Sequence, residues 1–300
     1  MKTYHDIEGD GGSRILDQVL EQRAAVVERM SSIGRIVAIG SGKGGVGKST
    51  ITMQLAHALR ARGKRVSILD ADINGPSQAR MAGLLDAPLV PSADGLVVPT
   101  NADGIGVVSL GTLVPEGRAI EFESVASGES HTWRATREFS ALGELLAAVH
   151  WGERDALLVD LPPGAERTVQ YADYFGPSTP FVLVTVPSDV ARGVVARSVD
   201  ALRSTNNPLL GYVENMAGYA CEGCDEIRPL FPESATHDLG IPVLGRIPFD
   251  PRLAAAADRG EGYPVAEGAV ARALRETADA CWSAVSSLPK AAPVAATTEE

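Results

Sequence analysis

Short apolar runs recur along the chain, separated by segments in which apolar residues return every three or four positions. The runs are rich in Val, Ile and Leu and lack polar alternation, as is typical of strands covered on both faces. They are residues 36–39, 66–69, 105–110, 156–159, 181–186, 209–213 and 243–247. Helical spacing lies between several of them, at 50–62, 140–149 and 191–204. This alternation predicts right-handed βαβ units, and so an α/β fold with a mostly parallel, doubly wound sheet of about seven to eight strands.

The ends of the chain depart from this alternation. Apolar positions within residues 15–30 have helical spacing, so residues 1–32 are expected to form an N-terminal helix or extension. Another amphipathic helix is predicted at 270–285, followed by an Ala-, Pro-, Thr- and Glu-rich tail, 289–300, expected to be disordered. Residues 33–288 show no internal repeat and no second domain boundary. They are predicted to form one domain.

Composition narrows the possible partners and the compartment. The 300 residues carry 27 Lys and Arg against 38 Asp and Glu, a formal charge of −11, which disfavours nucleic acid and anionic membranes as partners. No run reaches the roughly 18 apolar residues of a membrane-spanning helix. Three cysteines cannot make a disulfide scaffold, and the N-terminus lacks the apolar run of a secretory signal. We therefore expect a cytoplasmic protein.

A phosphate-binding pattern, Gly-x-x-x-x-Gly-Lys-Ser, follows the first predicted strand and opens a helix. Glycines let backbone amides turn toward phosphate, and the helix N-terminus adds its dipole. In this pattern Lys48 reaches the β- and γ-phosphates and Ser49 holds magnesium. The residues expected to bind nucleotide are Gly42, Lys43, Gly44, Gly45, Val46, Gly47, Lys48, Ser49 and Thr50. The alternative, a glycine-rich turn with an incidental lysine, does not explain the strand before and the helix after it.

Two acidic segments end predicted strands at the edge where ligands bind in parallel sheets. The first contains Asp70 and Asp72, and the second begins with Asp160. Asp160 is expected to hold magnesium through water, and Asp72 to position the water that attacks the phosphate. For either acid alone, a capping or turn role is the alternative.

Two of the three cysteines, Cys221 and Cys224, form a Cys-x-x-Cys loop after a predicted strand. A thioredoxin-like dithiol would need a helix directly after the first cysteine, which the acidic neighbours disfavour. A tetrahedral zinc or an iron–sulfur cluster needs about four thiolates, and a twofold dimer supplies four. Two unrelated thiols are the remaining alternative. Cys281 is expected to be a buried apolar residue, and His57 and His237 to be structural.

The phosphate loop contains a second lysine, Lys43, that the general pattern does not require. In this respect the chain resembles the deviant Walker A ATPases, which include the ParA/MinD partitioning proteins and the nitrogenase iron protein. In that group the lysine matching Lys43 acts across a dimer that encloses the nucleotides. The resemblance implies a homodimer and a magnesium-dependent ATPase.

Within that group the chain is most similar to the Mrp-type iron–sulfur cluster carriers. The matching segments are residues 41–50, 69–77, 159–164, 213–216, the Cys221/Cys224 pair and 245–251. The resemblance implies that Asn215 and the Pro248 loop surround adenine, so that ATP is the nucleotide. It also implies that Cys221 and Cys224 of two subunits bridge one labile 4Fe-4S cluster for delivery to apo iron–sulfur client proteins, with zinc as the alternative metal.

The chain departs from that family at four places. Ala165-Glu166-Arg167 replaces the usual Thr-Gly-Asp, and Asn74 stands where tyrosine is common. Residues 230–234 replace a Phe-Gly-Gly-rich stretch, and the Gly-, Ser- and acid-rich segment 116–132, a predicted loop or insertion, looks longer than usual. The extra N-terminal cysteines or small domain of other carriers are not found in residues 1–32. These differences suggest a divergent paralogue with a dedicated client.

Two other functions compete with the carrier hypothesis. A ParA/MinD-like positioning switch without a cluster usually needs a basic face or a basic amphipathic C-terminal helix, whereas 270–285 mixes both charges and the chain ends in Glu299-Glu300. An electron-transferring reductase similar to the nitrogenase iron protein draws its two thiolates per subunit from distant positions, not from a Cys-x-x-Cys pair.

Overall fold

A computed structural model describes residues 15–73, 75–85, 87–109, 131–221, 223–224, 226–231, 238–262 and 267–289. Its central sheet has the parallel strand order β11-β9-β8-β1-β7-β2-β5. A short strand, β10, pairs antiparallel with the end of β9. The strands are β1 (Ile36–Ser41), β2 (Val66–Asp70), β5 (Gly106–Ser109), β7 (Ala156–Asp160), β8 (Phe181–Thr185), β9 (Leu209–Ala220), β10 (Ile227–Arg228) and β11 (Val243–Phe249). The predicted α/β fold is confirmed.

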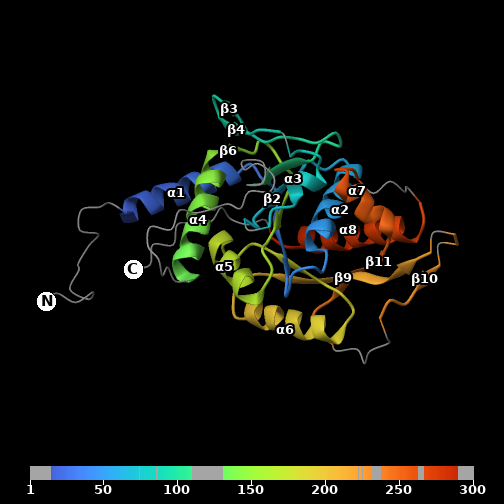
Figure 1. Ribbon diagram of the computed structural model, residues 1–300. Coiled ribbons are helices and arrows are strands. Elements are labelled where there is room, and N and C mark those ends of the chain that lie inside the picture. Colours follow the sequence, from blue (N-terminus) through green and yellow to red (C-terminus); the bar gives the residue numbers. More distant parts are fainter. Residues whose placement is uncertain are drawn as a thin grey trace.

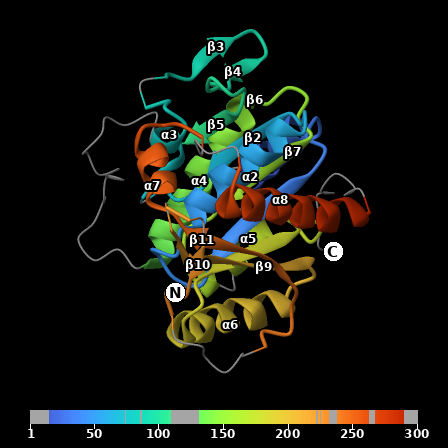
Figure 2. The same cartoon turned by 90° about the vertical axis from the view of Figure 1, so that its right-hand side faces the viewer.

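Helices cover both faces of this sheet (Figure 1). On one side lie α2 (Lys48–Ala61), α3 (Gln78–Met81), α7 (Pro251–Asp258) and α8 (Ala269–Ser287). On the other lie α1 (Ile15–Met30), α4 (His131–Ala148), α5 (Ala165–Phe175) and α6 (Asp189–Arg203). Figure 2 looks onto the side that carries α2 and α8. None of the helices formed by the described residues has the length and apolar content needed to span a bilayer.

The strands are mostly apolar because each of them contributes to two cores. In β1, Val37 and Ile39 pack in the cluster under α2 and α8, whereas Ala38 packs in the opposite cluster with Tyr171 of α5 and Val195 of α6. Successive side chains of a strand point to opposite faces, so a strand buried on both sides lacks the alternation of polar and apolar residues. All seven runs expected to be strands therefore form strands of the central sheet.

Some predicted boundaries were wrong. The helix expected at 140–149 begins at His131 and ends at Ala148, and Val149 opens the two-residue strand β6 (Val149–His150). The last two residues of the loop expected at 116–132 thus belong to α4, while residues 116–130 lie outside the described ranges. The tail expected at 289–300 also lies outside them, apart from its first residue.

Several elements were not predicted. Helices α5 and α7 are absent from the sequence-based assignment, as is a small sheet of β3 (Val90–Ser92), β4 (Gly95–Val97) and β6. The N-terminal helix α1 is present, and it packs beside α4, where the side chain of Arg29 donates to the Ala147 carbonyl.

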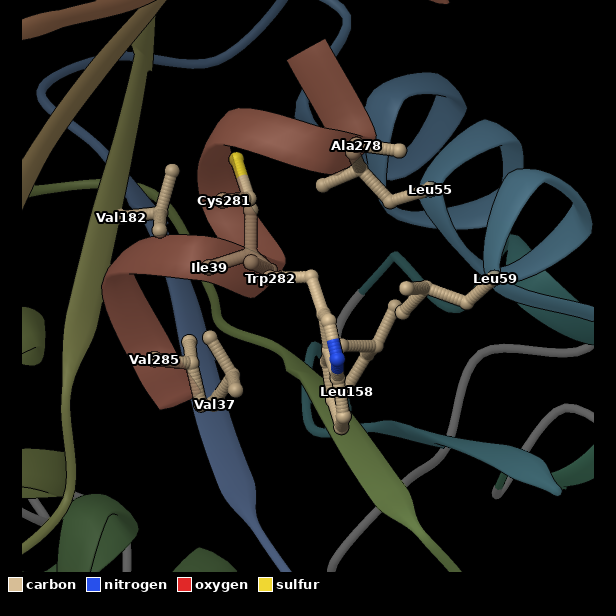
Figure 3. Close-up of a pocket in the computed structure, with 10 residues that line it drawn as sticks. All are labelled: Val37, Ile39, Leu55, Leu59, Leu158, Val182, Ala278, Cys281, Trp282 and Val285. Carbon is tan, nitrogen blue, oxygen red and sulfur yellow. The ribbon is translucent and has the colours of Figure 1, made fainter. Parts of the chain in front are cut away.

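A small apolar cavity of about 20 Å³ lies between α2, α8 and the central strands (Figure 3). Its walls include Leu55, Leu158, Cys281 and Trp282. A space of this size without polar partners neither orders water nor holds a polar ligand. The expectation that Cys281 is a buried apolar residue is confirmed, and burial raises the pKa of its thiol to about 12.

Candidate functional site

The phosphate-binding loop joins β1 to α2 at the carboxyl edge of the central strands. Gly45 and Gly47 have left-handed φ angles of 78° and 82°, and Gly47 is the N-cap of α2. Gly42 packs so closely against α6 that a Cβ there would lie 2.8 Å from the backbone of Val194. The left-handed backbone and this close packing require glycine, so the local conformation explains why the loop is glycine-rich. Backbone amides at the start of α2 suit an anion.

Lys48 begins α2 and is buried beside the acid that ends β7. Its Nζ contacts the carboxylate of Asp160, and the side chains of Lys48 and Asp160 are 7% and 0% exposed. The hydroxyl of Thr52 also donates to Asp160, over 3.3 Å. The Lys48 Nζ lies 3.4 Å from the hydroxyl of Ser49. Asp160 thus compensates the buried charge of Lys48.

Asp70 ends β2 directly beside Asp160 in the sheet register. Its carboxylate accepts the backbone N–H groups of Ser77 and Gln78, each over 2.9 Å. Burial, and secondly the charge of Asp160, raise the pKa of Asp70 to about 7. Two buried carboxylates next to a loop lysine form a site that favours a further cation. Asp70 was not among our predicted site residues, although its position opposite Asp160 follows from the strand order.

Asp72 lies in the turn that follows β2. Its backbone N–H donates to the Asp70 carboxylate, and its own carboxylate accepts the N–H of Gly75, both over 3.2 Å. The turn role considered as an alternative is therefore present in this structure. Asp72 is only half-buried, whereas Asp70 is buried.

Gln78, the first residue of α3, is a member of the site that no sequence motif indicated. Its side-chain amide donates to the Ser49 carbonyl over 3.0 Å and to the Asp160 carboxylate over 2.8 Å. Together with its backbone bond to Asp70, Gln78 contacts three segments of the site.

The structure brings Asn215 to the phosphate loop. Asn215 lies on β9, is buried, and donates from its side chain to the Val46 carbonyl over 2.9 Å. On the neighbouring strand β11, Ile247 pairs with Asn215, and Pro248 follows at an irregularity of the ladder. Asn215 thus lies beside the loop, and Pro248 lies on the strand next to that of Asn215. Lys43 is half-buried in the loop, where its carbonyl accepts the hydroxyl of Ser41.

The two cysteines lie in the hairpin that joins β9 to β10. The Cys221 N–H donates to the Glu226 carbonyl over 3.0 Å, which closes the turn. Cys224 is exposed and Cys221 is partly exposed. Hydrogen bonds from the Gly223 amide and from Cys224 lower the pKa of the Cys221 thiol. Since a strand follows instead of a helix, the thioredoxin-like interpretation is not supported.

The cysteine hairpin of a single chain does not complete a metal site. Within the ranges described above, no group of three or more His, Cys, Asp or Glu side chains is arranged to hold a metal ion. The pair Cys221 and Cys224 supplies two thiols, half of a tetrahedral set.

The loop residues fit a magnesium nucleotide. Left-handed glycines leave room for phosphate at Gly45, where an added Cβ would meet nothing within 4 Å. Lys48 would supply the cation for the phosphates, and the Ser49 hydroxyl with the carboxylates of Asp70 and Asp160 would supply oxygen ligands or acceptors for magnesium. A strand, a glycine-rich loop and a helix, with an acid on a neighbouring strand, define a P-loop nucleotide-binding protein.

Comparison with known proteins gives the particular family. A ParA model described as NUBPL iron-transfer P-loop NTPase matches residues 32–282, and the chain belongs to this family. An "Iron-sulfur cluster carrier protein" of Methanocaldococcus jannaschii is 35% identical over 245 residues, which cover 80% of this chain and 81% of the relative. The "Cytosolic Fe-S cluster assembly factor CFD1" of Candida glabrata is 35% identical over 248 residues, 79% and 84% of the two chains.

A solved structure shares the fold. The nucleotide-binding protein of Archaeoglobus fulgidus in complex with ADP superimposes with a TM-score of 0.67 at 32% identity, covering 81% of this chain and 93% of that one. The predicted resemblance to cluster carriers of the deviant Walker A group is confirmed by these relatives.

Proposed function

We propose that the protein is a homodimeric ATPase that holds a 4Fe-4S cluster between its two subunits and transfers it to apo iron–sulfur proteins. The observation that carries this proposal is the continuity of β9. This strand places Asn215 against the phosphate loop and ends at Ala220, directly before Cys221. The six residues from Asn215 to Ala220 span at most about 20 Å. They are interrupted only at Met216, which has a left-handed φ of 54°, so a single strand joins the nucleotide site to the cysteine pair.

In the nucleotide site, we assign binding of the β- and γ-phosphates to Lys48 and the backbone of residues 42–50. Ser49 would hold magnesium, and Asp160 would hold one of its water ligands once Lys48 has turned to the phosphates. Asp72, half-buried at the rim, would orient the attacking water. Bound magnesium would neutralise charge that develops on the phosphates. Asn215 and Pro248 would contact adenine. We expect hydrolysis to be slow.

The cysteine hairpin supports a dimer by its stoichiometry. One chain supplies Cys221 and Cys224, and the cluster or a zinc ion needs about four thiolates, so two hairpins meeting on a twofold axis complete the set. Lys43 would then face the nucleotide of the partner. The lowered pKa of Cys221 favours the thiolate that a metal binds.

The relatives support the same function. Proteins named as iron–sulfur cluster carrier and cytosolic cluster assembly factor align with four fifths of the chain, and the Archaeoglobus relative binds ADP. A cytoplasmic location and one ATPase domain at 33–288, with residues 1–32 as an extension, belong to the proposal. A positioning switch is less supported, because Val270, Leu274 and Val285 of α8 are buried in the core and not free to bind a membrane.

Metal analysis of anaerobically purified protein tests the proposal. Wild type, Cys221→Ala and Cys224→Ala are compared for iron, acid-labile sulfide and zinc per dimer. About four iron and four sulfide per wild-type dimer, lost in both variants, are expected for a shared cluster. Cys281→Ala is the matched control and should keep its metal. Stoichiometric zinc, or no metal after reconstitution, would contradict the carrier function and leave the ATPase intact.

A further inference from the structure

Gln78 connects three parts of the nucleotide site through separate groups. Its backbone N–H donates to Asp70 at the end of β2. Its side-chain nitrogen donates both to the Ser49 carbonyl in the phosphate loop and to the Asp160 carboxylate at the end of β7. These three partners are the residues whose hydroxyl or carboxylates surround the expected magnesium position. Gln78 is fully buried, with 0% of its surface exposed.

The orientation of the Gln78 amide is fixed by these contacts. A carbonyl and a carboxylate only accept hydrogen bonds, so the nitrogen of the amide must face both of them. The amide oxygen, Oε1, is then buried and has no hydrogen-bond partner among the described residues. An acceptor left unsatisfied in a protein interior costs about 1–3 kcal/mol, so such groups mark places where a ligand or water is missing.

The surroundings of Oε1 indicate what kind of group could donate a hydrogen bond to it. Oε1 belongs to the same amide as the nitrogen bonded to Asp160 and Ser49, so it lies within roughly 5 Å of both partners. The Asp70 and Asp160 carboxylates accept and do not donate, and the Lys48 ammonium lies against Asp160 and the Ser49 hydroxyl. No described residue donates a hydrogen bond to Oε1. Magnesium keeps several water ligands when it binds phosphates, and these waters are strong donors.

We propose that Gln78 is a positioning residue of the magnesium site. Its nitrogen fixes the Asp160 carboxylate against the phosphate loop, and its oxygen accepts a hydrogen bond from a water ligand of the bound magnesium. Because Gln78 follows the Asp72 turn in the chain, the same contacts link that turn to the metal. This inference rests on the proposed ATP binding and adds a specific residue to it.

The test separates nucleotide binding from the contribution of magnesium. Affinity for a fluorescent ATP analogue is measured with EDTA and with magnesium, and the ratio of the two dissociation constants gives the magnesium enhancement. Gln78→Met keeps the volume of the side chain and removes both polar groups. Because the enhancement is a ratio, a change in binding that is common to both conditions cancels, and we expect the magnesium enhancement to fall about tenfold, equivalent to about 1.4 kcal/mol.

Gln54→Met is the matched control. Gln54 lies on α2, is 3% exposed, and its side-chain nitrogen also has no hydrogen-bond partner among the described residues. The same substitution there should leave the magnesium enhancement unchanged. Equal enhancement in wild type and Gln78→Met, with both folded, would overturn the proposal while leaving ATP binding established. Absence of ATP binding by wild type would instead overturn the proposed function and this inference together.

Gln78→Glu gives a second measurement that does not depend on the methionine variant folding. Its carboxylate adds negative charge beside Asp70 and Asp160, so we expect thermal stability in ADP and EDTA to fall below that of wild type. Magnesium added with ADP should then raise its Tm by more than in wild type, since the charge lies next to the metal. An equal or smaller rise would contradict the placement of this side chain at the magnesium site.

Discussion

The phosphate-binding site and the cysteine hairpin differ in how much of each site a single chain supplies. At the phosphate loop, Lys48, Asp70 and Asp160 are almost entirely buried and bonded to one another or to neighbouring backbone. At the hairpin after β9, Cys224 is exposed, and the side chains of Ile227 and Leu230 are 48% and 45% exposed. The same strand, β9, reaches both regions.

The comparison shows what each kind of site needs. Phosphate binding uses backbone amides, one lysine and two acids that a single chain can enclose. A four-thiolate site on a twofold axis is completed only by a partner, and before assembly its residues remain at the surface. Met216, between Asn215 and the cysteines, has a left-handed φ of 54°, which costs of order 1–3 kcal/mol. This strained residue marks the boundary between the two regions on β9.

The largest effect is expected from Lys48→Ala. Lys48 is the buried cation of the loop, and charge-assisted contacts to phosphate are among the strongest in proteins. We expect ATP affinity to fall about 100-fold or more, close to 3 kcal/mol, measured by titration with a fluorescent analogue. Iron and sulfide per chain after reconstitution should remain at the wild-type level, because the polar side-chain contacts of Lys48 among the described residues are with Ser49 and Asp160 and not with the hairpin.

Lys43→Ala is the matched control for that experiment. The lysine belongs to the same loop but is only half-buried. If Lys43 acts across the dimer, its loss lowers hydrolysis while ATP affinity of the isolated chain changes less than about threefold. If Lys48→Ala keeps its fold stability but loses cluster binding, the phosphate-binding site and the cysteine hairpin do not bind their ligands independently.

Thiol modification should distinguish the hairpin from the core. At pH 7.5 on metal-free protein, iodoacetamide is expected to modify Cys221 and Cys224 at least about 100-fold faster than Cys281, measured by peptide mass spectrometry over time. The thiolate reacts, Cys281 is buried with a pKa of about 12, and the pKa of Cys221 is lowered. In denaturant the rates should become similar. A fast Cys281 in the folded protein would mean that α8 opens readily.

Asp70→Asn should stabilise the ligand-free protein in a pH-dependent manner. The folded-state pKa of Asp70, about 7, exceeds its ordinary 3.8, so the wild type loses stability as pH rises from about 4 to about 7. Asparagine can still accept the Ser77 and Gln78 N–H groups and carries no charge. We expect a Tm gain at pH 8 that vanishes near pH 4, with roughly 2–4 °C for each kcal/mol recovered.

Two comparisons test that prediction. Asp200→Asn, on an exposed pair with Arg203, should change Tm equally and slightly at both pH values. With ADP and magnesium present, wild type should gain more stability than Asp70→Asn, because the bound cation needs the carboxylate. A gain for Asp70→Asn at pH 4 as large as at pH 8 would mean that charge is not the cause.

The sequence predicted the parts of the site that local chemistry determines. Glycines and lysine of the loop occupy consecutive positions, so their pattern specifies the conformation directly. The Cys-x-x-Cys pair is also local. The contact of Gln78 with Asp160 joins residues 82 positions apart, and no spacing rule indicates which side chain of a short helix will reach that far. Such a contact depends on how β2, β7 and α3 pack.

The missed helices were within reach of the sequence. In α5, Thr168, Tyr171, Ala172 and Phe175 are buried at steps of three and four, the pattern of an amphipathic helix. In α7, Asp250 caps the first turn and Pro251 is the first helical residue. The start of α4 at His131 could not be predicted in the same way, because residues 131–138 are mostly polar and show little of the apolar spacing of a helix.

The smallest effect is expected from Ile227→Ser in the hairpin. Its side chain is about half exposed, so unfolding of the isolated chain should change by less than about 0.5 kcal/mol. If the hairpins of two subunits meet, the same substitution weakens the dimer about three- to tenfold, measured by sedimentation of cluster-loaded protein.

Val90→Ser is the matched control, since Val90 is 54% exposed on β3 in the small separate sheet. It should leave the dimer unchanged. If both variants weaken the dimer equally, the interface lies elsewhere. If only Ile227→Ser weakens it, the exposed hairpin is one half of a site that the partner completes.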